Sequence, residues 1–193
     1  MEELETAIRE RKKAEEALRQ LTMTDELTGL YNYRGFSTLA ARQVKSNRRA
    51  NQSSVLIYAD MDGLKHINDT LGHAEGSLAI VRIAQLLRQT FRESDIIGRL
   101  GGDEFAILAQ EITPNALDAM LCKLRENLRV YNIEQNQSYP LSLSIGATHI
   151  APQVYMGIEE LIARADEAMY EQKRSGKLCF TPGNTNGLPA RRT

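Results

Sequence analysis

Apolar runs and amphipathic stretches alternate along the middle of this chain, with turn residues between them. The apolar runs predict strands over residues 53–60 and 141–150, and a β-hairpin over 96–108. Apolar residues at helical spacing predict helices, one of which presents four leucines on a single face. These helices cover residues 33–49, 64–71, 75–91, 115–134 and 158–174. With no internal repeat or low-complexity stretch, the pattern indicates one domain that combines a sheet with helices.

The two ends of the chain follow other patterns, so we expect three parts: 1–23, 24–181 and 182–193. Near the N-terminus, two sets of seam positions recur every seven residues: Leu4, Arg11 and Leu18, and Ala7, Ala14 and Leu21. This pattern predicts a short coiled-coil helix that dimerises weakly, with a single charged helix as the alternative. We interpret it as the end of a signalling helix joined to an upstream sensor domain. The C-terminal part is rich in Pro, Gly and Asn, and we expect a disordered tail.

Composition excludes several classes of function. The 193 residues carry 24 Lys and Arg against 25 Asp and Glu, a net charge of −1, so no basic field points to a nucleic-acid partner. No apolar run approaches the roughly 18 residues that span a bilayer, and we expect no membrane segment and no signal peptide. Cys122 and Cys179 lack metal-ligand spacing and fit reduced thiols. A cytoplasmic enzyme is the simplest expectation.

The hairpin carries the first candidate chemistry. Gly101 and Gly102 stand between its two apolar runs, and Asp103 and Glu104 follow them directly. Glycines let the backbone approach a ligand closely, and the carboxylate beside them can hold a hard cation such as Mg²⁺ together with substrate phosphates. Taken alone, the same residues also fit a solvent-facing hairpin tip.

A second pair of acids follows the apolar run 53–60. Asp60 and Asp62 lie on one side of an extended chain by its period of two. Asp60 with Asp103 would form a platform of two carboxylates for one or two Mg²⁺ ions, which could polarise an α-phosphate and lower the pKa of an attacking hydroxyl. In the alternative interpretation, both acids cap the helix that starts near Gly63.

These segments together resemble the GGDEF domain family. Besides the hairpin, residues 25–34, 60–73 and 165–177 match the family pattern in order, so the resemblance spans 24–181. It implies a catalytic domain that condenses two nucleoside triphosphates, usually two GTP, into a cyclic dinucleotide, usually cyclic di-GMP, and releases two pyrophosphates. The implied fold is α/β (α+β), a central and mainly antiparallel sheet flanked by helices, as in nucleotidyl cyclases and polymerase palms. It also implies a homodimer, because each protomer would hold one triphosphate.

The resemblance assigns a role to each matching residue. The metal ligands would be Asp60, the backbone carbonyl of Met61, and Asp103, for Mg²⁺ or alternatively Mn²⁺, with Glu104 assisting. Asn68 matches the asparagine that contacts the base. The triphosphate would meet three lysines: Lys65, Lys173 and Lys177. For the last two, the alternative is a solvated helix end whose charges complement the helix dipole.

One position departs from the family pattern. The family's guanine-reading aspartate is replaced by Ser77. An ionised carboxylate only accepts hydrogen bonds and suits guanine, whereas a hydroxyl donates or accepts and can satisfy either purine. The change resembles the hybrid promiscuous subgroup, whose members join GTP with ATP into 3′,3′-cyclic GMP-AMP and also make cyclic di-GMP. The alternative is an ordinary GTP-specific diguanylate cyclase with a weakened guanine site.

Arg92 and Asp95 match the family's inhibitory site for bound cyclic dinucleotide, which would allow product feedback. The alternative is an ion pair between the two at the end of a helix. We expect Asp25 and Arg34 to form a structural pair. Two further classes of function remain open: a catalytically inactive GGDEF module that senses nucleotides, and a coiled-coil scaffold with a passive cap.

Overall fold

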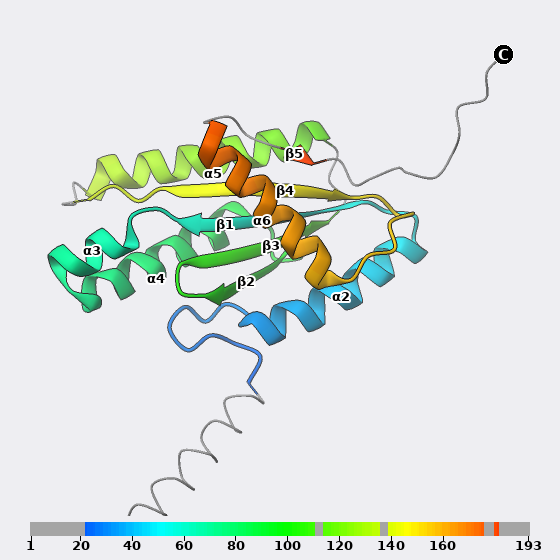
Figure 1. Cartoon of the computed structure of the whole chain (residues 1–193), viewed down its shortest axis with the longest axis horizontal. Coiled ribbons are helices and arrows are strands. Elements are labelled where there is room, and N and C mark those ends of the chain that lie inside the picture. The colour runs from blue at the N-terminus through cyan, green and yellow to red at the C-terminus, as the bar shows by residue number, and fades with distance from the viewer. Residues whose placement is uncertain (1–21, 111–113, 136–138, 176–179, 182–193) are drawn as a thin grey trace, which may run out of the picture.

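The computed structural model describes residues 22–110, 114–135, 139–175 and 180–181. These form one five-stranded sheet in the order β2-β3-β1-β4-β5 (Figure 1). Its strands are β1 (Ser54–Met61), β2 (Ile96–Gly101), β3 (Glu104–Gln110), β4 (Leu143–Ile150) and β5 (Phe180–Thr181). The first four pair antiparallel, and β5 pairs parallel to β4. The expected α/β fold with a mainly antiparallel central sheet is confirmed.

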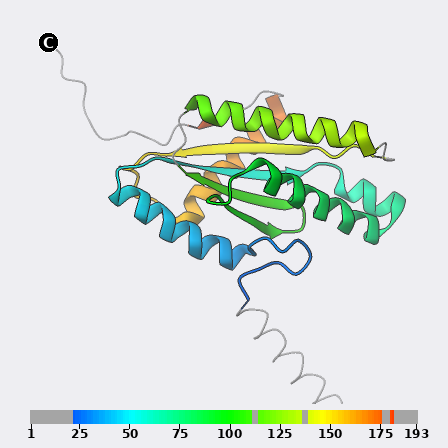
Figure 2. The same ribbon diagram turned by 180° about the vertical axis from the view of Figure 1, so that it is seen from behind.

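Helices cover both faces of this sheet. The described part of the chain contains α2 (Tyr33–Arg49), α3 (Leu64–Leu71), α4 (His73–Thr90), α5 (Pro114–Gln135) and α6 (Ile158–Ser175). Side chains of α2 and α6 form one core cluster with the sheet, and side chains of α4 and α5 form the other. Figure 1 looks onto the α6 side, and Figure 2 shows α4 and α5 in front of the sheet.

The central strand β1 is buried on both faces of the sheet. It lies between β3 and β4, and every residue of it except Asp60 is buried. Its side chains alternate between the two core clusters: Leu56 and Tyr58 pack on the α2 and α6 side, and Val55 and Ile57 on the other. Within β1, the partly exposed residue is therefore Asp60, which lies next to the last residue of the strand.

The predicted elements match the structure closely. The helices predicted at 33–49 and 64–71 have the observed bounds, and the other predicted helices and strands differ by one or two residues at an end. The short strand β5 was not predicted. The predicted coiled-coil helix lies almost wholly in residues 1–21, which are outside the described residues, as is the predicted tail. Within the described ranges, no helix is both long and apolar enough to cross a membrane.

Candidate active site

Strand β1 delivers Asp60 to a point where three strands meet. In the sheet register, Asp60 stands opposite Glu104 of β3 and Ser144 of β4. The next residue, Met61, donates its backbone N–H to the carbonyl of Asp103 at 3.0 Å. This hydrogen bond ties the hairpin turn to the end of β1. It brings Asp60, the backbone of Met61 and Asp103 together although more than 40 residues separate the two acids.

Hydrogen bonds from Arg99 hold the hairpin turn in place. Strand β2 ends at Gly101 and β3 begins at Glu104, so only Gly102 and Asp103 form the turn. Gly102 has φ +44°, a left-handed conformation that glycine adopts at little cost. Its carbonyl accepts two hydrogen bonds from the Arg99 guanidinium, at 2.9 and 2.7 Å. The turn is therefore a positioned loop rather than a free hairpin tip.

Helix α6 brings a lysine to these acids. The Nζ of Lys173 lies 2.5 Å from Oδ1 of Asp60 and 4.0 Å from Oδ1 of Asp62. Burial by itself lowers the pKa of Lys173, but the hydrogen bond to Asp60 and the surrounding negative charges outweigh it, so the pKa lies above its ordinary value. Those charges belong to Asp60, Asp62 and Asp103. Three carboxylates therefore share the field of one ammonium group.

Asp62 is held differently from Asp60. Its carboxylate accepts hydrogen bonds from the hydroxyls of Ser142 at 2.8 Å and Ser144 at 2.6 Å. Helix α3 has Gly63 at its N-cap, and no side chain there makes a capping hydrogen bond. The alternative that the two acids cap this helix is therefore wrong. Asp62 instead links the end of β1 to β4.

Glu104 has a partner that sequence reasoning missed. The hydroxyl of Tyr58 hydrogen-bonds Glu104, and Tyr58 is buried on β1. Burial first, and then the hydrogen bond and charge of Glu104, raise the pKa of Tyr58 far above its ordinary value. The available signal was the period of two, which puts Tyr58 on the same side of β1 as Asp60. Ser142 and Ser144 had no comparable signal, because only the sheet register brings them to Asp62.

The donor set fits a magnesium or manganese ion that shares its ligands with a substrate. Mg²⁺ is usually held by one or two carboxylates with phosphate oxygens and waters. Asp60, the Met61 carbonyl and Asp103 would supply such a partial set, and the ammonium group of Lys173 already marks a position for positive charge beside Asp60. Among the described residues, no group of three or more His, Cys, Asp or Glu side chains could hold a metal by itself.

The other two predicted phosphate-binding lysines are less defined. Lys65 is exposed in the first turn of α3, three residues beyond Asp62. Lys177 lies outside the described residues. Of the two lysines that the structure describes, Lys173 contacts the acids.

The predicted base-contacting residues lie where α3 meets α4. A Cβ atom on Gly76 would come within 1.9 Å of Oδ1 of Asn68, so the asparagine packs directly against this glycine. Gly76 immediately precedes Ser77 in the first turns of α4. Both Asn68 and Ser77 are partly exposed. Asn68 of α3 thus contacts the residue that precedes Ser77 in α4.

A three-residue network fixes the start of α4. Glu75 accepts hydrogen bonds from the Tyr139 hydroxyl at 2.6 Å and from Arg82 at 2.8 Å, and Arg82 also donates to Tyr139 at 2.7 Å. Burial first, and then the hydrogen bond to Glu75, raise the pKa of Tyr139 to about 12. The network anchors the helix two residues before Ser77. Sequence reasoning did not find it.

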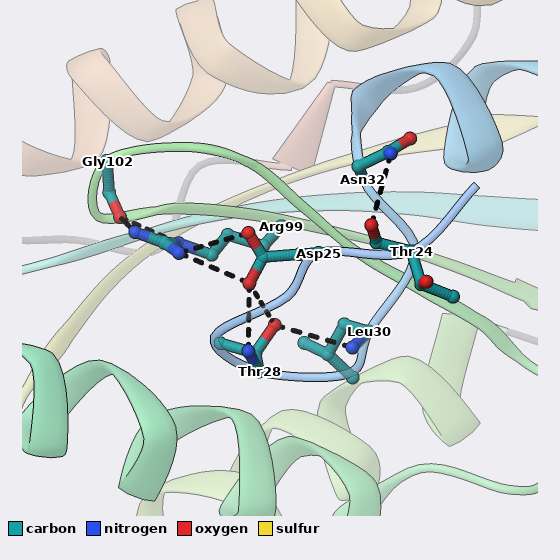
Figure 3. Close-up of polar contacts among 7 residues, drawn as sticks. All are labelled: Thr24, Asp25, Thr28, Leu30, Asn32, Arg99 and Gly102. Carbon is teal, nitrogen blue, oxygen red and sulfur yellow. Dashed lines mark hydrogen bonds and ion pairs between the residues drawn. The ribbon is translucent and has the colours of Figure 1, made fainter. Parts of the chain in front are cut away.

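The turn over residues 24–31 supports the hairpin from the N-terminal side. Figure 3 shows Arg99 between the Gly102 carbonyl and the carboxylate of Asp25, to which its Nη1 donates at 3.1 and 3.2 Å. Asp25 also accepts from the backbone N–H and the hydroxyl of Thr28, at 2.9 and 2.6 Å. The expected pairing of Asp25 with Arg34 is wrong, because its charged partner is Arg99.

The predicted product site borders a cavity of about 440 Å³ between the end of α4 and this turn. Arg88, Arg92 and Asp95 line the cavity. Asp95 is buried, and its carboxylate accepts from the backbone N–H groups of Arg92 at 2.9 Å and Gln110 at 3.3 Å. The alternative of an ion pair between Arg92 and Asp95 is therefore wrong, because Asp95 binds the backbone N–H of Arg92 instead. The guanidinium of Arg92 remains exposed beside the cavity.

Comparisons with known proteins agree with this geometry. The sequence matches the family described as "Diguanylate cyclase, GGDEF domain" over residues 22–179. It is 36% identical to the probable diguanylate cyclase DgcC of Escherichia coli over 162 residues, which are 83% of this chain and 43% of that protein. It is also 32% identical to the cyclic di-GMP phosphodiesterase PdeR of E. coli, over 92% of this chain and 27% of that protein. The chain thus spans less than half the length of these curated relatives.

A solved structure extends the likeness to three dimensions. The GGDEF domain of DgcB from Caulobacter crescentus, solved in complex with c-di-GMP, superimposes with a TM-score of 0.73 at 25% identity. The alignment covers 84% of this chain and 96% of that one. Fold, hairpin and sequence all agree, and the chain belongs to the GGDEF diguanylate cyclase family.

Proposed function

We propose that this chain is the catalytic domain of a dinucleotide cyclase that joins two purine nucleoside triphosphates into a 3′,3′-cyclic dinucleotide and releases pyrophosphate. The observation that carries the proposal is the convergence of Asp60, Asp103 and Lys173 from three distant segments. Two acids and a lysine at one point match the needs of a bound metal–triphosphate complex.

The residues of this cluster bind and orient the substrate. Asp60, the Met61 carbonyl and Asp103 would hold the Mg²⁺ or Mn²⁺ ion, which would polarise the α-phosphate and lower the pKa of the attacking hydroxyl. Lys65 and Lys173, with Lys177 beyond the described residues, neutralise the outer phosphates as flexible point charges. Glu104, held by Tyr58, assists beside the ligands.

Catalysis requires two copies of the chain. Each protomer holds one triphosphate, so the 3′-hydroxyl of one nucleotide must meet the α-phosphate of the other across a symmetric dimer. Such positioning converts a bimolecular step into a nearly unimolecular one and is worth roughly 7–11 kcal/mol of barrier at best. A monomer is accordingly inactive.

We propose further that the purine site accepts both GTP and ATP. Ser77 stands next to the Asn68–Gly76 contact, where a base contact is assigned. Its hydroxyl can donate or accept, so it lacks the discrimination of a carboxylate, which is worth about 1–3 kcal/mol for a bidentate contact. Cyclic GMP-AMP and cyclic di-GMP are both expected products.

The test is product analysis by mass spectrometry after incubation with Mg²⁺ and GTP alone, ATP alone, or both. Cyclic GMP-AMP as a major product of the mixture, absent in Asp103→Asn, supports the promiscuous cyclase. Cyclic di-GMP alone in every mixture means an ordinary GTP-specific diguanylate cyclase in which Ser77 does not set base choice. No product from a verified dimer rejects the cyclase proposal.

A sensing module is the second candidate. Its support is the 440 Å³ cavity beside Arg92 and the relative PdeR, which is named for phosphodiesterase activity. The cavity would take the cyclic dinucleotide, with Arg92 on a phosphate, either as feedback on an active cyclase or as the whole function. Calorimetric titration with cyclic di-GMP tests this, using Arg92→Ala as the variant. If Asp103→Asn keeps all function while Arg92→Ala loses it, the sensing module is correct.

A further inference from the structure

We propose that Lys173 is an exchangeable counter-ion, which closes the acid cluster to free metal ions and leaves it only when a metal ion and a triphosphate arrive together. This role rests on the proposed function and adds to it. Phosphate binding alone would not require Lys173 to contact Asp60, yet its Nζ lies 2.5 Å from that carboxylate.

Asp60 and Asp62 have different hydrogen-bond partners, and this difference supports the proposed role of the contact between Lys173 and Asp60. Asp62 is fixed by two serine hydroxyls, which are neutral donors. Among the described residues, the side-chain hydrogen-bond partner of Asp60 is Lys173. Asp60 is also less exposed, at 20% of its side chain against 38% for Asp62. A half-buried carboxylate near two others is costly without a cation, so Lys173 stabilises the cluster.

Lys173 and a metal ion compete for the same oxygen. A Mg²⁺ ligand oxygen lies about 2.0–2.1 Å from the ion, so an ammonium group in contact with that oxygen would meet the ion's full charge at short range. A free ion must therefore expel Lys173 into solvent and sacrifice its ion pair. A triphosphate changes this balance, because its oxygens offer the released ammonium group a new partner.

The same ion pair disfavours the binding of a nucleotide that carries no metal ion. Without a metal ion, a triphosphate near Asp60 and Asp103 meets like charges, and Lys173 cannot leave Asp60 for the phosphates without exposing that carboxylate. Metal and nucleotide therefore strengthen each other's binding, and the site selects the metal complex of the nucleotide over either component.

The anchoring of α6 makes this exchange a side-chain motion. A Cβ atom on Gly146 would lie 2.1 Å from the Ala165 carbonyl, so α6 rests directly on the backbone of β4. The helix is fixed, and Lys173 stands in its last turns, where the helix dipole favours a cation. Its four-carbon stem and single-point charge can move from carboxylate to phosphate without moving the helix.

The test measures Mn²⁺ binding to nucleotide-free protein by electron paramagnetic resonance. We expect weak binding by the natural chain and binding about tenfold or more tighter in Lys173→Ala, because the competing cation is gone. Arg174→Ala is the matched control: it also removes a cation from the last turn of α6, but at a residue with no part in the proposed binding site, and it should bind Mn²⁺ like the natural chain. Adding Asp60→Asn to Lys173→Ala should abolish the gain.

A second measurement repeats the titration with GTP present. GTP should tighten Mn²⁺ binding more in the natural chain than in Lys173→Ala, since only the natural chain exchanges a counter-ion. Equal or weaker Mn²⁺ binding by nucleotide-free Lys173→Ala overturns the inference. If that variant does not fold, Lys173→Gln, neutral and of similar shape, decides by the same criterion. Product formation is not the readout, so failure of the cyclase proposal is seen separately, as absence of product from the natural chain with Mg²⁺ and GTP.

Discussion

The two ends of the candidate site are built in opposite ways. At the phosphate end, Asp60, Asp103 and Lys173 come from three distant segments, and charge dominates. At the proposed purine end, Asn68 and Ser77 come from two consecutive helices, and Asn68 packs closely on Gly76. Ion pairs hold the groups of the proposed phosphate end in place, whereas close packing holds Asn68 at the proposed purine end.

Under the proposed function, we expect this difference to separate rate from selectivity. Changes at the phosphate end alter the charge that meets the reacting phosphates, so they should act on every nucleotide alike. Changes at the purine end alter contacts to a base, so they should act differently on GTP and ATP. Four experiments test this contrast.

The largest effect is expected at the phosphate end, from Asp60→Asn. Loss of a metal-binding carboxylate should lower product formation by roughly a thousandfold, for both GTP and the GTP–ATP mixture, because several kcal/mol of charge stabilisation disappear. Asp62→Asn is the matched control. One serine can still donate to the amide oxygen, and the other can turn its hydroxyl to accept from the amide nitrogen, so we expect a loss below about tenfold. Equal losses in steady-state assays would mean that the two acids share one role.

The next effect belongs to the purine end. Ser77→Asp should restore a carboxylate that suits guanine, and the ratio of cyclic di-GMP to cyclic GMP-AMP from an equimolar mixture should rise about 5- to 150-fold. Activity with GTP alone should stay within a few-fold of the natural chain, and Ser77→Ala controls for loss of the hydroxyl. An unchanged ratio by mass spectrometry would contradict the assignment of base choice to Ser77.

Gly76→Ala tests whether packing holds the purine end. The new Cβ would meet Oδ1 of Asn68 at 1.9 Å and force that side chain to rotate. Stability should change by no more than about 1–2 kcal/mol, since the gain in helix propensity offsets part of the strain. The KM for GTP should rise by about tenfold in kinetic assays.

The double variant Gly76→Ala with Asn68→Ala provides the control for this change. If Gly76→Ala acts by displacing Asn68, it should add little to the KM of Asn68→Ala, as a non-additive pair. Fully additive effects would show that the glycine matters for another reason.

The smallest effect concerns the turn that supports the phosphate end. Burial tends to raise the pKa of Asp25, but hydrogen bonds from Thr28 and the Arg99 guanidinium outweigh it, so the pKa lies below its ordinary value. A depressed carboxyl pKa contributes stability above the ordinary value near 4, and this contribution is lost as the pH falls through the folded-state value. The melting temperature should therefore exceed that of Asp25→Asn at pH 6, and the difference should shrink towards pH 3.

Glu126→Gln is the control for the comparison of melting temperatures between pH 6 and pH 3. Glu126 pairs with Arg129 on the exposed surface of α5, where solvent screens the charges, so its removal should change the melting temperature little at any pH. A gap between the natural chain and Asp25→Asn that stays constant down to pH 3 would contradict a stabilising role for the ionised carboxylate.

Local chemistry explains how much of the fold was predictable. The helix at 33–49 was placed correctly at both ends, and its start is marked by Asn32, whose side chain accepts from the N–H of Gly35. The strand predicted from residue 141 begins instead at Leu143, because Leu141 is bound by the side chain of Asn132 and Ser142 by Asp62. Contacts from elsewhere in the chain, which no local pattern contains, moved that boundary.

The order of the elements and the choice of Asp60 and Asp103 as candidate ligands could be read from the chain alone, since apolar periodicity and turn residues act over a few positions. The partners of the charged and polar groups required the folded structure: Lys173 for Asp60, Tyr58 for Glu104, and Arg99 rather than Arg34 for Asp25. Asp60 and Lys173 are separated by 113 positions. The physical reason is that a charge finds its partner through the register of strands and the packing of helices, and these depend on the whole core at once.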